Sequence, residues 1–252
     1  MIKVLVTNDD GIKAEGISKL VEVLKEKAEV YIVAPNGQRS ACGHGISIAK
    51  DVILKEVEYD GAVKALECSG TPVDCVKLGL THLAINGIDI DMVFSGINHG
   101  GNLGTDTLYS GTVSAAMEAA LCDVPALAFS INSHSPKHYE YVIDLIRDMF
   151  DGVCQNLKPG TVLNINVPNK PKEEIKGLKY TKLGRREYEE WLTPVESESG
   201  DFLYKYEGRP KVYDSKDLRY DVIAMQEGYA SLTPLQFDLT DHVIAETIWE
   251  RE

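Results

Sequence analysis

The sequence predicts an α/β protein with a three-layer, Rossmann-like fold and a mostly parallel central sheet. Short apolar runs rich in Val and Ile alternate with amphipathic segments at helical spacing, and polar loops containing glycine or proline follow the apolar runs. Length and composition agree, because 252 residues with 44% hydrophobic content can bury a core without disulfides. We expect an α/β domain carrying the site over residues 1–168 and a C-terminal extension over 169–252.

Charge and composition exclude several classes of partner. A net charge of −13 without a Lys/Arg cluster makes a nucleic-acid polymer or an anionic membrane an unsuitable partner. No segment reaches the roughly 18 apolar residues of a membrane span, and the chain starts with a strand instead of a signal sequence, so we expect a cytoplasmic protein. The cysteines form no CxxC pair and are interpreted as small buried residues. The histidines lack metal-ligand spacing and are interpreted as structural or surface residues.

The first predicted strand leads directly into two adjacent carboxylates. The run at 2–7 is typical of a buried parallel strand, and Gly11 permits a tight turn after it. Asp9 and Asp10 therefore lie at the carboxyl end of a strand, where open α/β sheets bind ligands. Two neighbouring acids there suggest a hard divalent cation held by oxygen ligands. The alternative is a turn closed by an Asx cap, without a ligand.

The next segments predict a strand–helix–strand unit. A surface helix is expected over 15–28 and a second strand over 30–35, which ends at a proline. If the two strands are parallel, the loop that contains Ser40 approaches the turn after the first strand. Arg39 is then a candidate for attracting a phosphate, and a solvated loop without a site is the alternative.

The following region departs from strict α/β alternation. Short strands are predicted over 46–68, with a hairpin turn at Tyr59, Asp60 and Gly61. A helix of about three turns is then expected within 69–80, because a Ser or Thr cap is followed by a proline at an early helical position.

The segment 91–121 has the densest pattern of small and polar residues. A strand is expected to end at Phe94, and a helix to begin with Ser110, Gly111 and Thr112 in its first turn, where free N–H groups and the positive end of the dipole favour an anion. The loop between them carries four glycines whose amides can approach that anion closely: Gly96, Gly100, Gly101 and Gly104. This predicts a phosphate cradle, although neither a P-loop nor a dinucleotide fingerprint is present. Close helix packing is the alternative reason for the small residues.

The remainder predicts further α/β elements and then an arm. Strands are expected over 124–132 and 161–168, and between them an amphipathic helix over 138–154 with Tyr141, Leu145, Ile146 and Met149 facing inward. The polar stretch 169–220 is interpreted as a long hairpin arm, and a helix is expected to begin near Thr240. The arm carries aromatic rings that need a neighbouring subunit to cover them: Tyr188, Trp191, Phe202, Tyr204 and Tyr206.

Five motifs in one order resemble the survival protein SurE family of nucleotidases: VTNDDGI, VAPNGQRSACGHGIS, SGTPVDCV, SGINHGGNLGTDTLYSGTVSAAMEA and GYASLTPL. The resemblance is dense over residues 1 to about 135 and returns near 221–240. It implies a metal-dependent phosphatase for nucleoside monophosphates, assembled as a homodimer or homotetramer through exchanged C-terminal elements, including the hairpin arm and terminal helix. The 5′ position is the implied target, with the 3′ position and short polyphosphate left open.

The resemblance also implies roles for individual residues. The metal ligands would be Asp9 and Asp10 of NDDG, Ser40 of the QRSA loop and Asn98 of SGIN. The family's phosphate loop and helix start fall on Asn102, Ser110, Gly111 and Thr112. One divalent cation per subunit, Mg²⁺ or Mn²⁺, suits these oxygen donors better than zinc.

Asp9 and Asp10 are the candidate catalytic residues. The adjacent pair lacks the DxD arrangement of aspartyl-phosphate enzymes, which favours water over a carboxylate as the nucleophile, although the sequence leaves both open. Two other classes of protein are considered as alternatives. A binding module that holds metal and nucleotide without turnover needs the same cradle, and an oxidoreductase on a doubly wound sheet is disfavoured by the missing glycine fingerprint.

Overall fold

The computed structural model describes residues 1–152, 156–189, 192–197 and 199–249. Its centre is a nine-stranded sheet of order β3-β4-β2-β1-β5-β6-β7-β13-β8. The strands of this sheet are β1 (Ile2–Thr7), β2 (Ala28–Pro35), β3 (Leu54–Val57), β4 (Lys64–Cys68), β5 (Met92–His99), β6 (Ala126–Ile131), β7 (Val162–Val167), β8 (Leu178–Tyr180) and β13 (Ala230–Leu235). The six strands from β4 to β7 run parallel, whereas β3 and β13 are antiparallel to β4 and β7.

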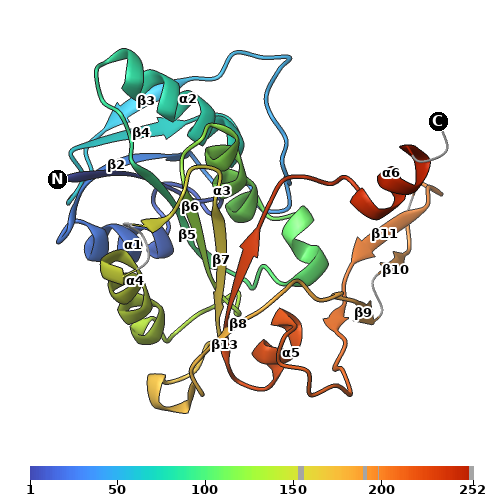
Figure 1. The fold of residues 1–252 in the computed structure, drawn as a ribbon. Helices are drawn as coiled ribbons and strands as arrows, with labels where there is room; N and C mark the ends of the chain where they lie inside the picture. Colours follow the sequence, from blue (N-terminus) through green and yellow to red (C-terminus); the bar gives the residue numbers. More distant parts are fainter. Residues whose placement is uncertain (153–155, 190–191, 198, 250–252) are drawn as a thin grey trace.

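Helices cover both faces of this sheet (Figure 1). The described helices are α1 (Glu15–Leu24), α2 (Pro72–Ile85), α3 (Gly111–Leu121), α4 (Glu140–Gly152), α5 (Asp221–Gln226) and α6 (His242–Trp249), with short 3₁₀ turns η1 (Gly104–Leu108) and η3 (Lys172–Glu174). One face of the sheet is covered by α1 and α4 and the other by α2 and α3, whereas α6 lies beside the arm. Alternating residues of β1 show the two layers: Val4 and Val6 pack into the core with α1 and α4, and Leu5 packs into the core with α2 and α3. The predicted three-layer α/β fold is confirmed.

The predicted capping signals locate the start of α2 correctly, whereas the ends of α2 and α1 differ from the prediction. Thr71 caps α2, with Asp74 completing a capping box, and the hairpin turn before it is also present between β3 and β4. The helix continues to Ile85, further than expected. In contrast, α1 ends at Leu24 instead of 28, because the chain turns there to enter β2, whose Ala28 pairs with Ile2.

The strand predicted to end at Phe94 continues as β5 to His99. Its pairing with β6 is interrupted between Ser95 and Asn98 and then resumes, with Asn98 opposite Ser130. Gly96 makes this irregular path possible, because its φ is +133° and a Cβ there would lie 2.4 Å from the Phe129 carbonyl oxygen. Asn98 therefore lies at the end of a strand and not in the loop that the sequence predicts.

Burial also corrects two expectations about side chains. The inward face of α4 is formed by Val142, Ile146, Met149 and Phe150, whereas Tyr141 and Leu145 are only half-buried. Cys68 and Cys75 are buried as expected, but Cys42 is half-buried and Cys122 is exposed. Cys154 and Trp191 lie outside the described residues.

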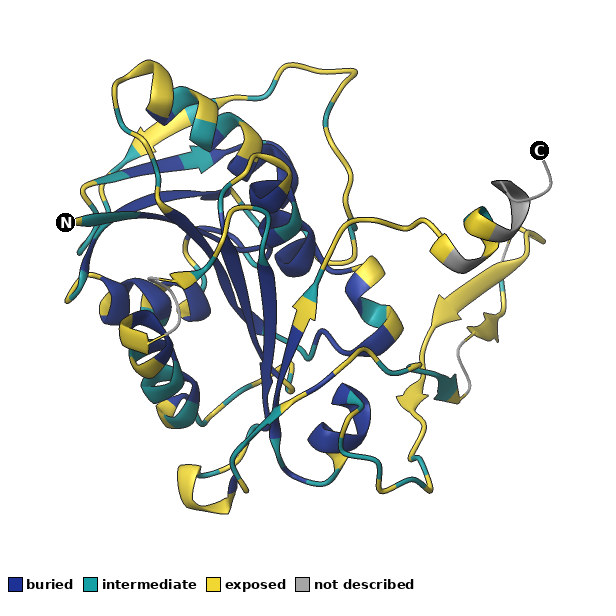
Figure 2. Cartoon of the chain, in the orientation of Figure 1, coloured by how far each residue is buried: buried dark blue, intermediate teal, exposed yellow. Residues whose placement is uncertain are grey.

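The C-terminal part extends the sheet and forms the predicted arm. Residues beyond 168 supply β8 and β13, and an antiparallel hairpin of β10 (Leu192–Val195) and β11 (Leu203–Tyr206) projects from the sheet together with the short pair β9 (Tyr188–Glu189) and β12 (Arg209–Pro210) (Figure 1). Figure 2 shows buried central strands and an exposed arm. Within the described residues, no helix has the length and apolar character needed to cross a membrane.

Candidate metal and phosphate site

A cavity of about 850 Å³ lies where β1 and β5 end, bounded by the loop after β2, the glycine loop, η1, the start of α3 and the arm. Its lining residues are Asp9, Gln38, Ser40, Ala41, Asn98, His99, Gly100, Gly101, Asn102, Asp106, Tyr109, Ser110, His134, Tyr188 and Tyr206. Five of the predicted site residues therefore meet in one cavity. The cavity lining does not include Asp10, Gly111 or Thr112. Gly111 and Thr112 contact Asp9, and Asp10 follows Asp9 in the chain.

The turn after β1 shows which residue makes the Asx cap of the alternative interpretation. The Asx cap exists, but Asn8 makes it: Gly11 N donates to Asn8 Oδ1 (3.1 Å), and Asn8 Nδ2 donates to the Gly11 carbonyl oxygen (2.9 Å). Gly11 takes a φ of +102° at this turn. Because Asn8 closes the turn, the carboxylates of Asp9 and Asp10 are not needed for it.

Asp9 is buried against the first turn of α3. Its Oδ1 accepts a hydrogen bond from the Thr112 hydroxyl (2.6 Å). Burial raises the pKa of Asp9 to about 6, the charge of Asp10 acts in the same direction, and the Thr112 hydroxyl opposes both. Gly111 allows this approach, because a Cβ there would lie 2.7 Å from the Asp9 Cβ.

Asp10 is half-buried, and its Oδ2 accepts a hydrogen bond from the backbone N–H of His99 (3.3 Å). Among the described residues, neither Asp9 nor Asp10 forms an ion pair with a basic side chain. Two neighbouring carboxylates without a positive partner are electrostatically unfavourable, and a bound cation would relieve that repulsion.

The loop after β2 approaches Asp9 as the βαβ argument predicts. The backbone N–H of Arg39 donates to the Asp9 carbonyl oxygen (2.7 Å), and Ser40 lines the cavity with its hydroxyl oxygen accepting from Gln38 Nε2 (2.9 Å). The Arg39 guanidinium turns elsewhere. It donates to Asn36 Oδ1 (2.9 Å) and to the carbonyl oxygens of Ser69 and Gly70 (3.4 Å each), so it holds the corner before α2 and is not part of the cavity lining.

Asn98 enters the cavity from the end of β5. Its Nδ2 donates to the Gly100 carbonyl oxygen (2.7 Å), which fixes the amide and leaves Oδ1 as the acceptor atom without a hydrogen bond among the described residues. No group of three or more His, Cys, Asp or Glu side chains in the described part of the chain could hold a metal ion. A cation here would therefore depend on two carboxylates, one hydroxyl and one amide oxygen, a donor set that suits Mg²⁺ or Mn²⁺.

The glycine loop is held rigidly from behind. Asn102 N donates to Asn166 Oδ1 (2.7 Å), its Nδ2 donates to Ser130 Oγ (2.8 Å), and its carbonyl oxygen accepts from Asn164 and Asn166. Further along, the buried carboxylate of Asp221 accepts from Gly104 N (2.7 Å). A loop fixed by these hydrogen bonds can present its remaining backbone groups to an anion without rearranging.

Ser110 is the N-cap of α3, as predicted, and its oxygen accepts from Val113 N (3.0 Å). Since a hydroxyl has one proton to donate as well, Ser110 can cap the helix and still donate to a phosphate oxygen in the cavity. Thr112 differs, because its hydroxyl is already donated to Asp9.

Two groups of cavity residues were missed by the sequence interpretation. The histidines were treated as structural or surface residues, yet His99 and His134 line the cavity. Their positions in the sequence could have indicated a place in the site, because both lie at or just after the carboxyl ends of parallel strands, β5 and β6. The aromatic wall of Tyr109, Tyr188 and Tyr206 had no such signal, because Tyr188 and Tyr206 come from the arm, far along the chain.

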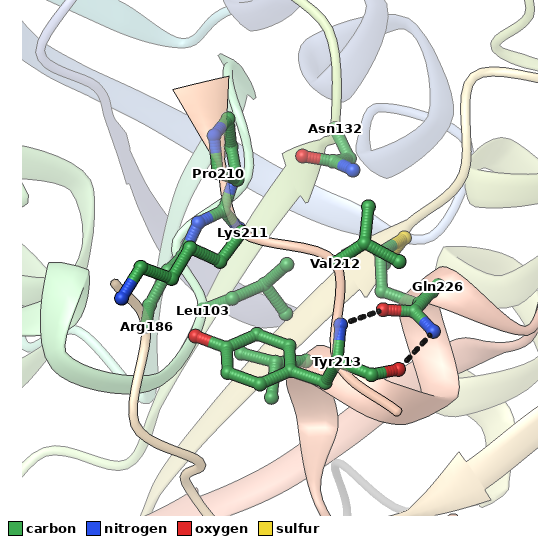
Figure 3. A pocket seen from close by; sticks show the side chains of 10 residues that line it. Leu103, Asn132, Arg186, Pro210, Lys211, Val212, Tyr213 and Gln226 are labelled. Carbon is green, nitrogen blue, oxygen red and sulfur yellow. Dashed lines mark hydrogen bonds between the residues drawn. The ribbon is translucent and has the colours of Figure 1, made fainter. Parts of the chain in front are cut away.

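A second cavity, of about 190 Å³, lies between the glycine loop, the end of the arm and α5 (Figure 3). It contains no carboxylate and none of the predicted site residues. Gln226 of α5 makes two hydrogen bonds of 2.9 Å with the backbone of Tyr213, drawn as dashed lines in Figure 3. These contacts fasten the chain that leaves the arm to α5.

The fold and cavity define a class of protein: a Rossmann-like α/β protein with an acidic, oxygen-donor site at the carboxyl edge of its sheet. The family model for survival protein SurE matches residues 4–190. A relative from Pelotomaculum thermopropionicum, named 5′-nucleotidase SurE, is 43% identical over 249 residues, which are 98% of this chain and 94% of that protein. Another of that name, from Desulforamulus reducens, is 42% identical over 244 residues, covering 96% of this chain and 95% of the relative.

The crystal structure of the SurE protein from Aquifex aeolicus matches with a TM-score of 0.83 at 35% identity, covering 99% of this chain and 100% of that one. This chain belongs to the survival protein SurE family. It is therefore an enzyme, a phosphomonoester hydrolase like the relatives named 5′-nucleotidase.

Proposed function

We propose that this protein hydrolyses nucleoside monophosphates to nucleoside and phosphate, with one divalent cation bound by Asp9, Asp10, Ser40 and Asn98. One observation carries the proposal. Asp9 and Asp10 stand side by side without a basic partner among the described residues, and Asp9 opens into the cavity that also contains Asn102 and Ser110.

The donor set fits a hard cation on chemical grounds. Asp9 is 4% exposed, and burying a carboxylate beside a second one is unfavourable unless positive charge compensates it. The Asn98 amide is fixed through its nitrogen, so its oxygen is the atom available to a cation. When bound, the cation would neutralise phosphate charge and polarise the phosphorus.

The other residues of the cavity have separate roles in this proposal. Ser110 and the second Nδ2 proton of Asn102 are hydrogen-bond donors for phosphate oxygens, held in place by their contacts to Val113 and Ser130. Gly111 and Thr112 act indirectly, because they hold the carboxylate of Asp9 at the start of α3. Water is the proposed nucleophile.

Phosphate release tests the proposal directly. Purified protein is incubated with a panel of 5′- and 3′-nucleoside monophosphates and a short polyphosphate, each with Mg²⁺, with Mn²⁺ and after metal removal with EDTA. We expect release from the 5′-monophosphates with Mn²⁺ or Mg²⁺ and none in EDTA. Asp9→Asn and Asp10→Asn should lower Mn²⁺ affinity and turnover together, because each removes a negative charge from a site that holds a dication.

A binding module without turnover is the rival outcome. It would bind nucleotide and Mn²⁺ calorimetrically but release no phosphate. Assembly through the arm and a cytoplasmic location stay predictions. The arm prediction is supported by exposed apolar side chains on the hairpin, including Leu192, Phe202 and Leu203.

A further inference from the structure

His134 lies just past the end of β6 and faces the same 850 Å³ cavity as Asp9 and Asn98. Its ring stands over Gly100: a Cβ on Gly100 would lie 3.4 Å from His134 Cε1 and 3.5 Å from His134 Nδ1. The side chain is exposed, and no hydrogen bond or ion pair involves the ring among the described residues. An imidazole thus points at the cavity with both nitrogens available for a ligand.

Hydrolysis of a phosphate monoester needs a proton at the leaving oxygen, because a ribose alkoxide is a poor leaving group near neutral pH. The orientation of the substrate follows from the shape of the site. Asp9 is 4% exposed at the closed end of the cavity, whereas Tyr109 and Tyr206 are 59% and 75% exposed. A bulky nucleoside therefore extends from the buried Asp9 toward the exposed lining residues, and His134 is one of these.

The other titratable groups of the cavity are less suited to donate that proton. They are Asp9, His99, Asp106, Tyr109, Tyr188 and Tyr206. Asp9 is a proposed metal ligand, and His99 Nε2 is engaged with the Tyr139 hydroxyl (2.7 Å). Asp106 Oδ2 lies 3.1 Å from Arg186 Nε and also accepts from the Tyr188 hydroxyl. The phenols of Tyr109, Tyr188 and Tyr206 hold their protons too tightly for an efficient general acid near neutral pH, because a phenol has an ordinary pKa of ~10.

We propose that His134 is the general acid that protonates the leaving ribose oxygen, an inference that rests on the proposed function. As water attacks phosphorus, the bond from phosphorus to the ester oxygen breaks, and its electron pair stays on that oxygen. The imidazolium proton of His134 moves to the same oxygen and yields the nucleoside alcohol. The attacking water releases its proton to solvent, and the neutral imidazole takes one back from solvent before the next turnover.

A comparison of leaving groups tests this role. His134→Gln is assayed with a nucleoside 5′-monophosphate and with 4-nitrophenyl phosphate, whose leaving anion needs little help from an acid. We expect kcat for the nucleotide to fall by about 10²–10⁴, the range for loss of a general acid, and kcat for the aryl ester to change by less than about tenfold. The nucleotide kcat of the unaltered enzyme should fall at alkaline pH, and this fall should be absent in the variant.

His138→Gln is the matched control, because His138 follows in the same loop but does not line the cavity. It should leave both activities unchanged, and Mn²⁺ affinity by calorimetry should be unchanged in both variants. Equal loss of both substrates in His134→Gln, full retention of nucleotide turnover, or weakened Mn²⁺ binding would each overturn the assignment. If the unaltered enzyme released no phosphate from either ester, the proposed function itself would fail.

Discussion

Thr112 is the residue for which the family resemblance and the structure predict different effects. The resemblance places it among phosphate contacts, whereas in the structure its hydroxyl donates to the buried carboxylate of Asp9 at 2.6 Å. Thr112→Val removes that donor at nearly constant volume. A hydrogen bond to a charged group contributes about 1.5–3 kcal/mol, and Asp9, at 4% exposure, cannot recover it from water.

Two measurements follow from that magnitude. Urea unfolding in EDTA should show a free energy of unfolding lower by about 1.5–3 kcal/mol. If the same hydrogen bond orients Asp9 for the cation, the calorimetric Kd for Mn²⁺ should rise about tenfold or more, since 1.4 kcal/mol corresponds to a factor of ten.

Thr112→Ser is the matched control, because it keeps the hydroxyl and removes one buried methyl group, worth about 1 kcal/mol. Its Mn²⁺ affinity should stay near that of the unaltered protein. If Thr112→Val bound Mn²⁺ normally but was inhibited less by inorganic phosphate, the hydroxyl would serve the phosphate, and the argument from Asp9 would be wrong.

Three further outcomes are expected. Ser110→Ala should lose about 1 kcal/mol of stability with the cap and bind phosphate less tightly, while calorimetric Mn²⁺ affinity stays unchanged; a large loss of Mn²⁺ binding would contradict this. Asp221→Ala strips the acceptor from the backbone N–H groups of Gly104, Gly184 and Val222, so urea unfolding should show a loss of about 3 kcal/mol or more, and a loss below about 1 kcal/mol would refute it. Replacing residues 192–206 with a Gly/Ser linker should lower the sedimentation coefficient beyond the change in mass; an unchanged assembly would mean that the hairpin packs within its own subunit.

The core of the fold could be predicted from sequence because its signals are local. The β1 run, the Thr71 cap with Pro72, and the Ser110 cap each depend on residues within a few positions of one another. The carboxyl-edge rule adds one long-range statement, that Asp9 and the Ser40 loop converge, and the hydrogen bond from Arg39 N to the Asp9 carbonyl oxygen bears it out.

The tertiary structure determines which polar groups are hydrogen-bonded within the protein and which remain available to a ligand. Sequence could not tell that Asn8 closes the turn, that Arg39 serves the corner before α2, or that the Thr112 hydroxyl is donated to Asp9. The Asn8 cap is local, but the Asx-turn signal does not show which polar residue makes it. The partners of Arg39 at Ser69 and Gly70 and of Thr112 at Asp9 are distant in the chain, and only packing brings them together. For His134 the sequence offered only its place after the end of a strand, and the pairing of β5 with β6 brings its ring over Gly100.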